Sequence, residues 1–478
     1  MKQDSLLENL QHYSREGAYP FHMPGHKRNP PREDGLPWRL DITEIDGFDD
    51  LHHPGGILQA GMERAARLWG SRRAFFLVGG STCGILAAIR AAAPEGSRVL
   101  TARNCHRSVF HGIELFRLRP VYLTPPVDRS SGIWGSVSPR QVEEALERDP
   151  QIALVILTSP TYEGVLSDVG AIAALCHRRG IPLLVDEAHG AHLGVAPAFG
   201  PGAVAAAADL VVQSLHKTLP SLTQTALLHL QGELVAEEEV ARQLSIFQSS
   251  SPSYPLMASI DQCVRLVEEE GERWFPRWKD RLARFSRQVE GLERLRVLCN
   301  GKDRPAEHPA FWGMDPSKLV ISTRGTSLTG PQLKNQLRER YALELEMAQG
   351  EYALAMTGLW DREEGLDRLA QALLAIDGQV ERRPAEETVS LPEAPPQILT
   401  IAAARKAPGR LVPLSRSAGA ICREYVWAYP PGIPLLAPGQ QVTGAVLRSL
   451  AEMASSGVEL HSTSGRLPEE LEVVRSLA

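Results

Sequence analysis

The feature that most constrains the fold of this chain is a regular alternation of short apolar runs and amphipathic segments between residues 56 and 230. Strands that are apolar on both faces are typical of a largely parallel sheet covered by helices on both sides. The pattern therefore predicts an α/β fold. We expect strands at 74–78, 98–101, 152–157, 181–185, 210–212 and 225–230, and helices at 56–69, 83–93, from about 108, and at 168–179.

The length of 478 residues indicates two or three domains with additional connecting segments. A long charged helix is expected at 268–293, and a smaller α/β unit follows with a strand at 318–322 and a helix at 331–340. We therefore predict an N-terminal arm at 1–48, a large α/β domain at 49–295, a small α/β domain at 296–380, a Pro- and Glu-rich linker at 381–396, and a C-terminal domain at 397–478.

Composition and charge exclude several classes of function. The net charge of −6 and the lack of a basic block exclude a nucleic-acid partner. The first residues lack the apolar core of a signal peptide, and no apolar run is long enough to cross a bilayer, so we expect a cytoplasmic protein without a membrane partner. Six scattered cysteines without CxxC spacing do not indicate a disulfide scaffold or a structural zinc site.

One histidine pair has the spacing of a helical zinc site. His22 and His26 are four residues apart, but Pro24 and Gly25 lie between them and break the helix that such a pair needs. We therefore expect no metal.

Two side chains that follow apolar strands carry the predicted chemistry. The run 181–185 ends in Asp186, and Lys217 comes shortly after the run 210–212. A lysine amine can form an imine with the aldehyde of pyridoxal phosphate (PLP), and a carboxylate keeps the ring nitrogen of that cofactor protonated. Either residue alone is more often a loop cap or a solvated lysine. The pair, with His189, Ser214 and His216 around it, favours a PLP site.

Two further segments fit the same cofactor. Gly79-Gly80-Ser81-Thr82 lies between a predicted strand and a predicted helix, where backbone N–H groups and two hydroxyls form a phosphate cradle. His106 follows the strand at 98–101, and its flat ring is suited to stacking on a pyridine ring. The alternative readings are an ordinary helix cap for the first segment and a loop histidine for the second.

At this point the sequence resembles the Orn/Lys/Arg decarboxylases, a bacterial family of PLP enzymes. The resemblance covers nearly the whole chain. Its motifs are Pro20-Phe-His-Met-Pro-Gly-His-Lys27, Asp41-Ile-Thr-Glu44, Asp50-Leu51, Gly79-Gly-Ser-Thr82, Asn104-Cys-His-Arg-Ser108, Pro160-Thr-Tyr-Glu-Gly164, Val185-Asp-Glu-Ala-His189, Ser214-Leu-His-Lys217 and Tyr429-Pro-Pro-Gly-Ile-Pro434.

The resemblance implies a PLP-dependent transferase fold of type I, in which helices sandwich a mostly parallel seven-stranded sheet and smaller α/β domains follow. It also implies decarboxylation of arginine, lysine or ornithine to a polyamine precursor and CO2, by a homodimer with shared active sites. The implied catalytic residues are Lys217, Asp186 and His216; the implied cofactor contacts are Ser81, Thr82, His106, Asp186, Ala188, His189, Ser214, His216, Lys217 and, from the partner subunit, Ser249.

The chain departs from the family pattern in three places. The arm motif begins at residue 20, so the N-terminal wing that builds decamers in larger members is absent, and a dimer or tetramer is expected. Ala428 and Gln440 replace the usual Pro and Glu beside the Tyr-Pro-Pro-Gly loop. Since Gln440 removes a carboxylate, the substrate stays open among the three basic amino acids.

Several alternatives also stay open from sequence. Glu163, Glu424 and the 429–440 loop with Gln440 are the candidates for holding the distal cation of the substrate. An aminotransferase, C–S lyase or aldolase shares the Asp and Lys but needs an arginine for the α-carboxylate, for which Arg324 is the best candidate. A relative that binds PLP without turnover is the third reading.

Overall fold

The computed structural model describes residues 5–16, 19–28, 35–303, 305–384, 394–428, 432–455 and 459–475. The chain divides into two compact units. The first unit comprises Met1–Ala92, Pro182–Trp278 and Gly358–Trp360, and the second comprises Ala93–Ile181, Lys279–Thr357 and Asp361–Ala478. Each unit combines segments that are separate in the sequence, so this division does not test the boundaries of the five predicted parts, which stay a prediction.

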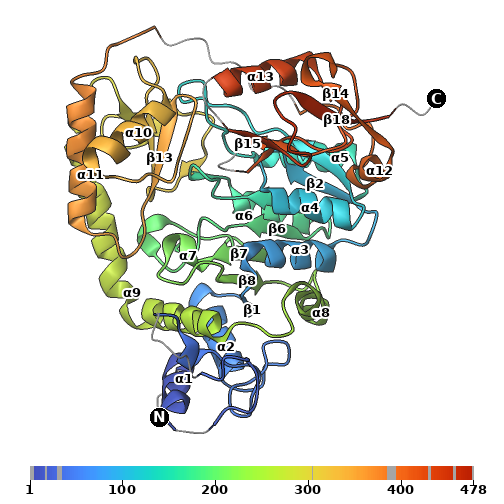
Figure 1. Cartoon of the computed structure of the whole chain (residues 1–478), viewed down its shortest axis with the longest axis vertical. Helices are drawn as coiled ribbons and strands as arrows, with labels where there is room; N and C mark the ends of the chain where they lie inside the picture. Colours follow the sequence, from blue (N-terminus) through green and yellow to red (C-terminus); the bar gives the residue numbers. More distant parts are fainter. Residues whose placement is uncertain are drawn as a thin grey trace. The chain divides into compact units, whose positions relative to one another are not determined.

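The main sheet has seven strands in the order β1-β8-β7-β6-β4-β2-β3 (Figure 1). The parallel pairs are β2–β3, β2–β4 and β6–β7, whereas β8 runs antiparallel to both β1 and β7. The mostly parallel seven-stranded sheet predicted from the sequence is thereby confirmed. The strands are β1 (Arg73–Leu77), β2 (Arg98–Ala102), β3 (Arg119–Leu123), β4 (Ile152–Thr158), β6 (Leu183–Asp186), β7 (Leu210–Ser214) and β8 (Ala226–Leu230).

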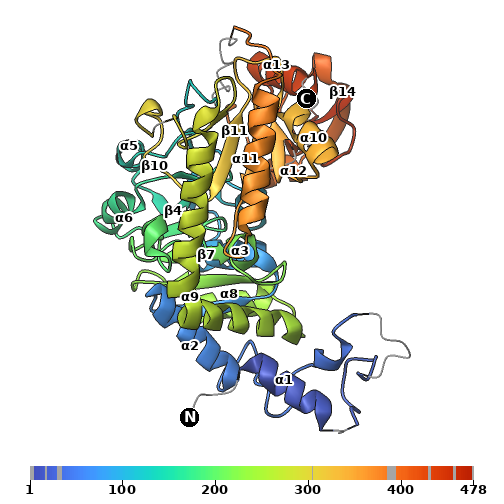
Figure 2. The same ribbon diagram turned by 90° about the vertical axis from the view of Figure 1, so that its left-hand side faces the viewer.

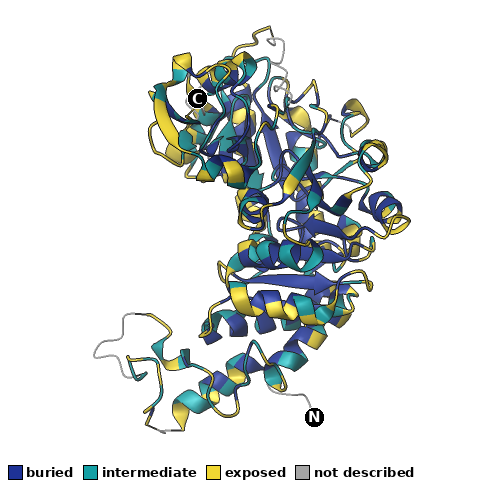
Figure 3. Cartoon of the chain, turned by 90° about the vertical axis from the view of Figure 1, so that its right-hand side faces the viewer, coloured by how far each residue is buried: buried dark blue, intermediate teal, exposed yellow. Residues whose placement is uncertain are grey.

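The sequence pattern identified six of these strands and missed β3. The missed strand lies at the end of the sheet order and carries Pro120, which an edge strand tolerates because one of its sides needs no ladder hydrogen bonds. Its side chains are only partly buried, so the apolar run that marks the inner strands is weak there. By contrast, β7 and β8 are buried at every position, as the burial colours of Figure 3 display.

Helices of the first unit pack on its strands. The helix α3 (Gly80–Ala92) lies against β7 and β8 on one side and against α8 (Glu237–Phe247) on the other. It begins three residues before the predicted start at 83, because the Gly79-Gly80 turn leads directly into the helix. The remaining helices here are α1 (Leu6–Arg15), capped by Ser5 with Glu8, and α2 (Ile57–Trp69), as predicted.

The long helix α9 (Tyr254–Gln288) corrects one prediction. Its expected range of 268–293 was read from charged residues, whereas the helix begins at Tyr254. The added first half is apolar and buried, including Met257, Ile260 and Val264, so it carries no charge pattern to mark it. Pro255 is tolerated because the first turn of a helix has no intrahelical acceptor for its missing N–H.

The second unit contains the helices that follow β2, β3 and β4, together with small sheets. Asp168 caps α6 by accepting a hydrogen bond from the Ala171 amide at 3.0 Å. The helices are α4 (Arg107–Leu115), α5 (Pro139–Arg148) and α6 (Val169–His177), and a two-stranded sheet pairs β5 (Val165–Leu166) with β10 (Gly313–Met314).

A four-stranded antiparallel sheet in the second unit has the order β12-β13-β11-β9. The helix α10 packs on β12 and β13, and α11 packs against α10 (Figure 2). The predicted strand at 318–322 and helix at 331–340 are confirmed. The elements are β9 (Arg296–Val297), β11 (Lys318–Ser322), β12 (Met347–Gln349), β13 (Tyr352–Met356), α10 (Gly330–Tyr341) and α11 (Glu363–Asp377).

The C-terminal residues of the second unit form two more small sheets around their own apolar core, which includes Cys422, Val426, Val446 and Leu471. No helix in the described ranges has the length and apolar character needed to cross a membrane. The elements are α12 (Ile401–Lys406), β14 (Gly409–Pro413), β15 (Val426–Ala428), β16 (Pro434–Leu436), α13 (Gly444–Ser455), β17 (Leu460–Ser462) and β18 (Glu470–Val474).

Candidate active site

The carboxyl ends of two neighbouring parallel strands deliver the predicted acid and lysine. Asp186 is the last residue of β6 and lies in register with Val212 of β7. The strand β7 ends at Ser214 and continues into the single-turn helix α7 (Leu215–Thr218), which carries Lys217. Since carboxyl ends of parallel strands share one edge of the sheet, both side chains belong to the edge where ligands bind in such folds.

Burial and charge set the protonation of this pair. Asp186 is buried, and the Ala188 amide donates to its Oδ1 at 3.1 Å. Burial raises the pKa of Asp186, while the positive charge of Lys217 and the Ala188 hydrogen bond oppose that shift. The positively charged ring N–H of bound pyridoxal phosphate would also lower the pKa of Asp186 and favour its carboxylate form.

Two histidines flank the lysine. The Nζ of Lys217 lies 2.8 Å from Nε2 of His189. Nδ1 of His216 donates to the Thr225 carbonyl at 2.9 Å, so its proton is held on that nitrogen and Nε2 faces away from it. Burial lowers the pKa of His216, and Lys217 lowers it further, which keeps the ring neutral. Both rings can therefore exchange protons with groups near Lys217.

The turn before α3 has the geometry of an anion cradle. Gly80 has a φ of +73°, which favours glycine, and its N–H donates to the Gln224 carbonyl at 2.9 Å. A Cβ on Gly79 would meet Sγ of Cys83 at 3.0 Å, so the turn has no room for a side chain there. Ser81 and Thr82 sit in the first turn of α3, where unpaired N–H groups attract an anion.

Two glutamines that the sequence analysis did not single out hold this turn. Nε2 of Gln224 donates to the Val78 carbonyl at 2.6 Å, and Oε1 of Gln248 accepts from the Val78 N–H at 2.9 Å. Gln248 also donates to the Phe76 carbonyl at 3.3 Å. A lone glutamine in a loop gives no sequence signal, although Gln248 directly precedes Ser249, which the family resemblance had marked.

A chain of buried, hydrogen-bonded side chains begins at Glu187, next to Asp186, and continues through Gln213 to His229. Glu187 accepts hydrogen bonds from Gln213 Nε2 and from the Ala203 amide, both at 2.8 Å. Oε1 of Gln213 lies 3.2 Å from Nε2 of His229, whose Nδ1 lies 3.0 Å from the Ser71 hydroxyl. Burial raises the pKa of Glu187 to about 8 and lowers that of His229 to about 3, so both are mainly neutral at pH 7.

These residues fit a phosphorylated aldehyde with a basic ring nitrogen. The Ser214 hydroxyl is buried and has no hydrogen-bond partner among the described residues, which is costly unless a ligand supplies one. Its donor capacity suits a phosphate, as does the first turn of α3 with Ser81 and Thr82. Lys217 offers an amine for the aldehyde and Asp186 an acid for the ring nitrogen, so the set matches pyridoxal phosphate.

His106 and Ser249 occupy positions outside this cluster of contacts. His106 is the N-cap of α4 in the second unit, where Nδ1 accepts from the Ser108 amide at 3.3 Å. Ser249 is exposed in the first unit, and its hydroxyl donates to the Ser251 carbonyl at 3.2 Å. Their contacts with a cofactor stay a prediction from the resemblance.

The three candidates for binding the substrate's distal cation all belong to the second unit and are buried. Glu163 accepts from the hydroxyls of Tyr352, at 2.8 Å, and Thr161, at 3.2 Å. Glu424 accepts from the backbone amides of Ser464 and Glu472, at 2.8 and 2.6 Å.

The third candidate, Gln440, braces the chain that follows the Tyr-Pro-Pro-Gly motif. Its Oε1 accepts from the Ala437 amide at 2.9 Å and from Arg103 at 3.5 Å, and Arg103 also donates to the carbonyls of Pro434 and Leu435. Residues 429–431 of the motif itself lie outside the described residues. Arg324, the candidate α-carboxylate clamp, forms an ion pair with Glu351 at 3.0 Å.

Known proteins resemble this chain over most of its length. The Bacillus subtilis protein YaaO is 35% identical over 94% of both chains. An arginine decarboxylase of Halalkalibacterium halodurans is 30% identical over 99% of this chain and 98% of its own. The crystal structure of a lysine decarboxylase from Francisella novicida superimposes with a TM-score of 0.84 over 98% of this chain and 81% of its own, at 19% identity.

The family model described as the major domain of Orn/Lys/Arg decarboxylases matches residues 5–320. That range contains the strand ends, the cradle and the lysine described above. The structural similarity independently confirms the fold of type I predicted from sequence. The chain therefore belongs to the Orn/Lys/Arg decarboxylase family.

Proposed function

We propose that the chain binds pyridoxal phosphate and removes CO2 from a basic L-amino acid, namely arginine, lysine or ornithine, to yield a polyamine precursor. The observation that carries the proposal is the pair of Asp186 and Lys217 at the ends of the parallel strands β6 and β7. The family membership and the arginine decarboxylase relatives at about 30% identity support the reaction class.

Bound pyridoxal phosphate would supply a carbonyl for the substrate's amino group and a ring that accepts electrons. Asp186 would hold a proton on the ring nitrogen, and Ser81, Thr82 and Ser214 would bind the phosphate. His106 and Ala188 would cover the two ring faces. Orienting the scissile bond is the main task left to the chain, since a fixed geometry contributes much of an enzyme's rate.

A proton must return to Cα after CO2 has left. Nζ of Lys217 is our principal candidate for delivering it, and Nε2 of His189, at 2.8 Å, would then replenish that proton. Nε2 of His216 is the second candidate, because Nδ1 of that ring is committed to the Thr225 carbonyl. A group with a pKa near neutrality is best suited to such transfers.

For the distal cation of the substrate, Glu163 is the most favourable of the three candidates. Its carboxylate is shared with two hydroxyls, which can rotate toward another acceptor when a cation arrives. The Glu424 carboxylate accepts from two backbone amides, which are fixed in place, and Gln440 has no charge.

We also propose a cytoplasmic homodimer with shared active sites. The N-terminal arm exposes Tyr19, Phe21 and Met23 at 66%, 89% and 65% of their surface, and such apolar groups on one segment favour burial against another chain. The exposed Ser249 hydroxyl would reach the cofactor phosphate of the partner subunit. Polyamine synthesis would be the process that consumes the product.

Transamination and C–S cleavage are not favoured. They need an arginine for the substrate's α-carboxylate, and the candidate Arg324 is already paired with Glu351. Two relatives that match more than nine-tenths of this chain, at 30% and 31% identity, are named arginine decarboxylases.

The test is CO2 release by purified protein loaded with pyridoxal phosphate, with arginine, lysine and ornithine assayed in parallel. Lys217→Ala serves as the blank, because it removes the amine while leaving the rest of the site in place. We expect release from at least one substrate and none in the blank. Cofactor absorbance that depends on Lys217, without CO2 from any substrate, would refute decarboxylation and favour a PLP-binding relative without turnover.

A further inference from the structure

Three potential metal ligands converge in the second unit, outside the residues of the proposed decarboxylase site. One ligand atom each from Cys299, Asp303 and His308 lies within 4.8 Å of the other two. Asp303 and His308 are buried, and Cys299 is partly buried. A single cysteine without CxxC spacing gives no metal signal, so the sequence did not predict that a thiol, a carboxylate and an imidazole converge here.

His308 is oriented by a carboxylate on its far side. Its Nδ1 lies 3.0 Å from Oδ2 of Asp128, and its Nε2 lies 2.7 Å from Oδ2 of Asp303. The Asp128 carboxylate is itself fixed by the amide and hydroxyl of Ser131, at 2.9 and 2.7 Å. A histidine that ligates a metal commonly donates its other N–H to such a carboxylate, so Nε2 is the nitrogen prepared for an ion.

The backbone brings the thiol to the same place. Cys299 has a φ of +55°, a left-handed conformation that residues with a side chain rarely adopt. The Cys299 amide donates to Oδ2 of Asp303 at 2.7 Å, which fixes this turn against the carboxylate. A strained position maintained by hydrogen bonds often serves a site, here by directing the thiol toward Asp303 and His308.

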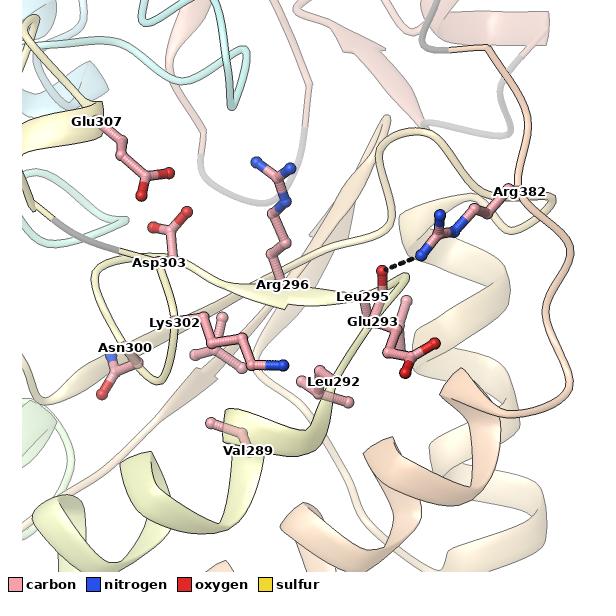
Figure 4. A pocket seen from close by; sticks show the side chains of 11 residues that line it. Val289, Leu292, Glu293, Leu295, Arg296, Asn300, Lys302, Asp303, Glu307 and Arg382 are labelled. Atoms are coloured by element: carbon pink, nitrogen blue, oxygen red, sulfur yellow. Dashed lines mark hydrogen bonds between the residues drawn. The ribbon is translucent and has the colours of Figure 1, made fainter.

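Solvent reaches the cluster through two pockets that share Asp303. One, of about 410 Å³, is lined by Asp303 and Glu307, and the other, of about 470 Å³, is lined by Asp303 and His308. Figure 4 shows the carboxylates of Asp303 and Glu307 pointing toward one another in the first pocket. An ion could enter from either side, and Glu307 or a water could occupy a fourth ligand position.

We propose that Cys299, Asp303 and His308 bind one zinc ion, with Asp128 orienting the imidazole. A mixed set of sulfur, nitrogen and oxygen ligands suits zinc better than magnesium or calcium, which prefer oxygen alone. Zn–N and Zn–O bonds of roughly 2.0–2.2 Å place two tetrahedral ligands about 3.4 Å apart. Nε2 and the Asp303 oxygen, now at 2.7 Å, would need to separate by less than about 1 Å.

The ligand set balances the charge of the ion. A cysteine ligates zinc as the thiolate, so the Cys299 thiol would lose its proton to the solvent when the Zn–S bond forms. The thiolate and the Asp303 carboxylate together carry two negative charges, which match the two positive charges of the ion, and the His308 imidazole ligates as a neutral ring.

The competing explanation is a metal-free ionic clamp, in which protonated His308 simply joins Asp128 and Asp303. The clamp needs no thiol, so Cys299→Ser separates the two explanations. The matched control is Cys176→Ala, which removes a different buried thiol within α6. Asp128→Asn is the second test, because losing the orienting carboxylate should weaken zinc binding about 10- to 100-fold without removing a ligand.

The experiment measures zinc in the PLP-loaded protein after treatment with a chelator and return of zinc in competition with a chromophoric indicator. We expect one tightly bound equivalent in the wild type and in Cys176→Ala. Binding should weaken in Asp128→Asn and more severely in Cys299→Ser. Unchanged far-ultraviolet circular dichroism and cofactor absorbance would show that the variants remain folded.

Proton release gives an independent readout. Calorimetric titration with zinc in buffers of different ionisation enthalpy should show more protons released per ion in the wild type than in Cys299→Ser, because only the wild type has a thiol that loses its proton on binding. A thiolate-to-cobalt charge-transfer band should appear with cobalt in the wild type and vanish in Cys299→Ser. No stoichiometric zinc in the wild type, or equal affinity in the wild type and Cys299→Ser, would overturn the proposal and leave the ionic clamp.

Discussion

At the scale of single residues, two adjacent acids in the candidate site have different roles. Asp186 and Glu187 are both buried, but Asp186 is the last residue of β6 and Glu187 follows the strand, and the two carboxyl groups have different neighbours. Asp186 is influenced by Lys217, whereas Glu187 bonds to Gln213 and the Ala203 amide. Asp186 is thus placed to keep its charge beside a cationic ring, while Glu187 belongs to a neutral chain that supports the strand ends.

The pKa of Glu187 predicts a pH dependence of folding stability. Burial raises this pKa from 4.5 to about 8 in the folded chain, so the folded state binds the proton more tightly than the unfolded state. The resulting stability is full below about pH 4.5 and is lost as the pH rises through about 8. Glu187→Gln, which cannot titrate, should lack this loss.

Thermal unfolding of both proteins from pH 5 to pH 9 checks this expectation. The melting temperature of the wild type should fall relative to that of Glu187→Gln as the pH rises, by an amount equivalent to a few kcal/mol at most. Gln213 and His229 can reverse their donor and acceptor roles to accommodate the new amide. Parallel curves would contradict the assignment, and Glu233→Gln, at an exposed position, is the control.

At the scale of elements, burial decided what the sequence could predict. The inner strands were recognisable because apolar side chains cover both faces. The edge strand β3 was not recognised because it carries Pro120 and is mostly only partly buried. The first half of α9 was not recognised because the expected range was read from the charged residues that follow it. The hydrogen bonds of Gln224 and Gln248 to Val78 were not predicted, because they depend on how segments that are distant in the sequence pack together.

Gln248 couples the loop after α8 to the strand β1, and we expect its loss to weaken cofactor binding. Gln248→Ala leaves the Val78 N–H and the Phe76 carbonyl without this partner in a buried position. Such a loss costs roughly 1–3 kcal/mol of stability. Because Val78 directly precedes the Gly79-Gly80 turn, the phosphate cradle should also loosen.

Titration of the apoprotein with pyridoxal phosphate and urea unfolding measure the two effects. Ser245→Ala, which removes an exposed hydroxyl of α8 that donates to the Arg242 carbonyl, should change neither. Lower stability with unchanged cofactor affinity would show that Gln248 does not control the turn.

At the scale of the whole molecule, the predicted active site depends on residues that no single element contains. Local sequence patterns predicted that Asp186 and Lys217 follow the ends of strands, and the family resemblance predicted Ser249 as a cofactor contact. Spacing within one sequence cannot say whether a side chain acts in its own subunit or in a partner. The cluster of Cys299, Asp303 and His308 was missed because a single cysteine without CxxC spacing gives no metal signal, and the contact of His308 with Asp128 joins distant segments.

Ser249 makes the shared-site prediction testable. Within its own chain the hydroxyl bonds only to the 249–251 turn among the described residues, and it is exposed. If it binds the cofactor phosphate of the partner subunit, Ser249→Asp should abolish activity in a homodimer by repelling that phosphate. A mixed dimer of Ser249→Asp and Lys217→Ala chains would still contain one intact site, with Lys217 from one chain and Ser249 from the other.

Co-expression of the two variants with different affinity tags allows the mixed dimer to be purified and assayed. We expect about half of the wild-type activity per dimer, since one of its two sites is intact and the other carries both defects. Each homodimeric variant, purified in parallel, should be inactive and so provides the control. If Ser249 acts within its own chain, every site in the mixed dimer lacks one of the two groups. An inactive mixed dimer of normal assembly would therefore show that the active sites are not shared through this residue.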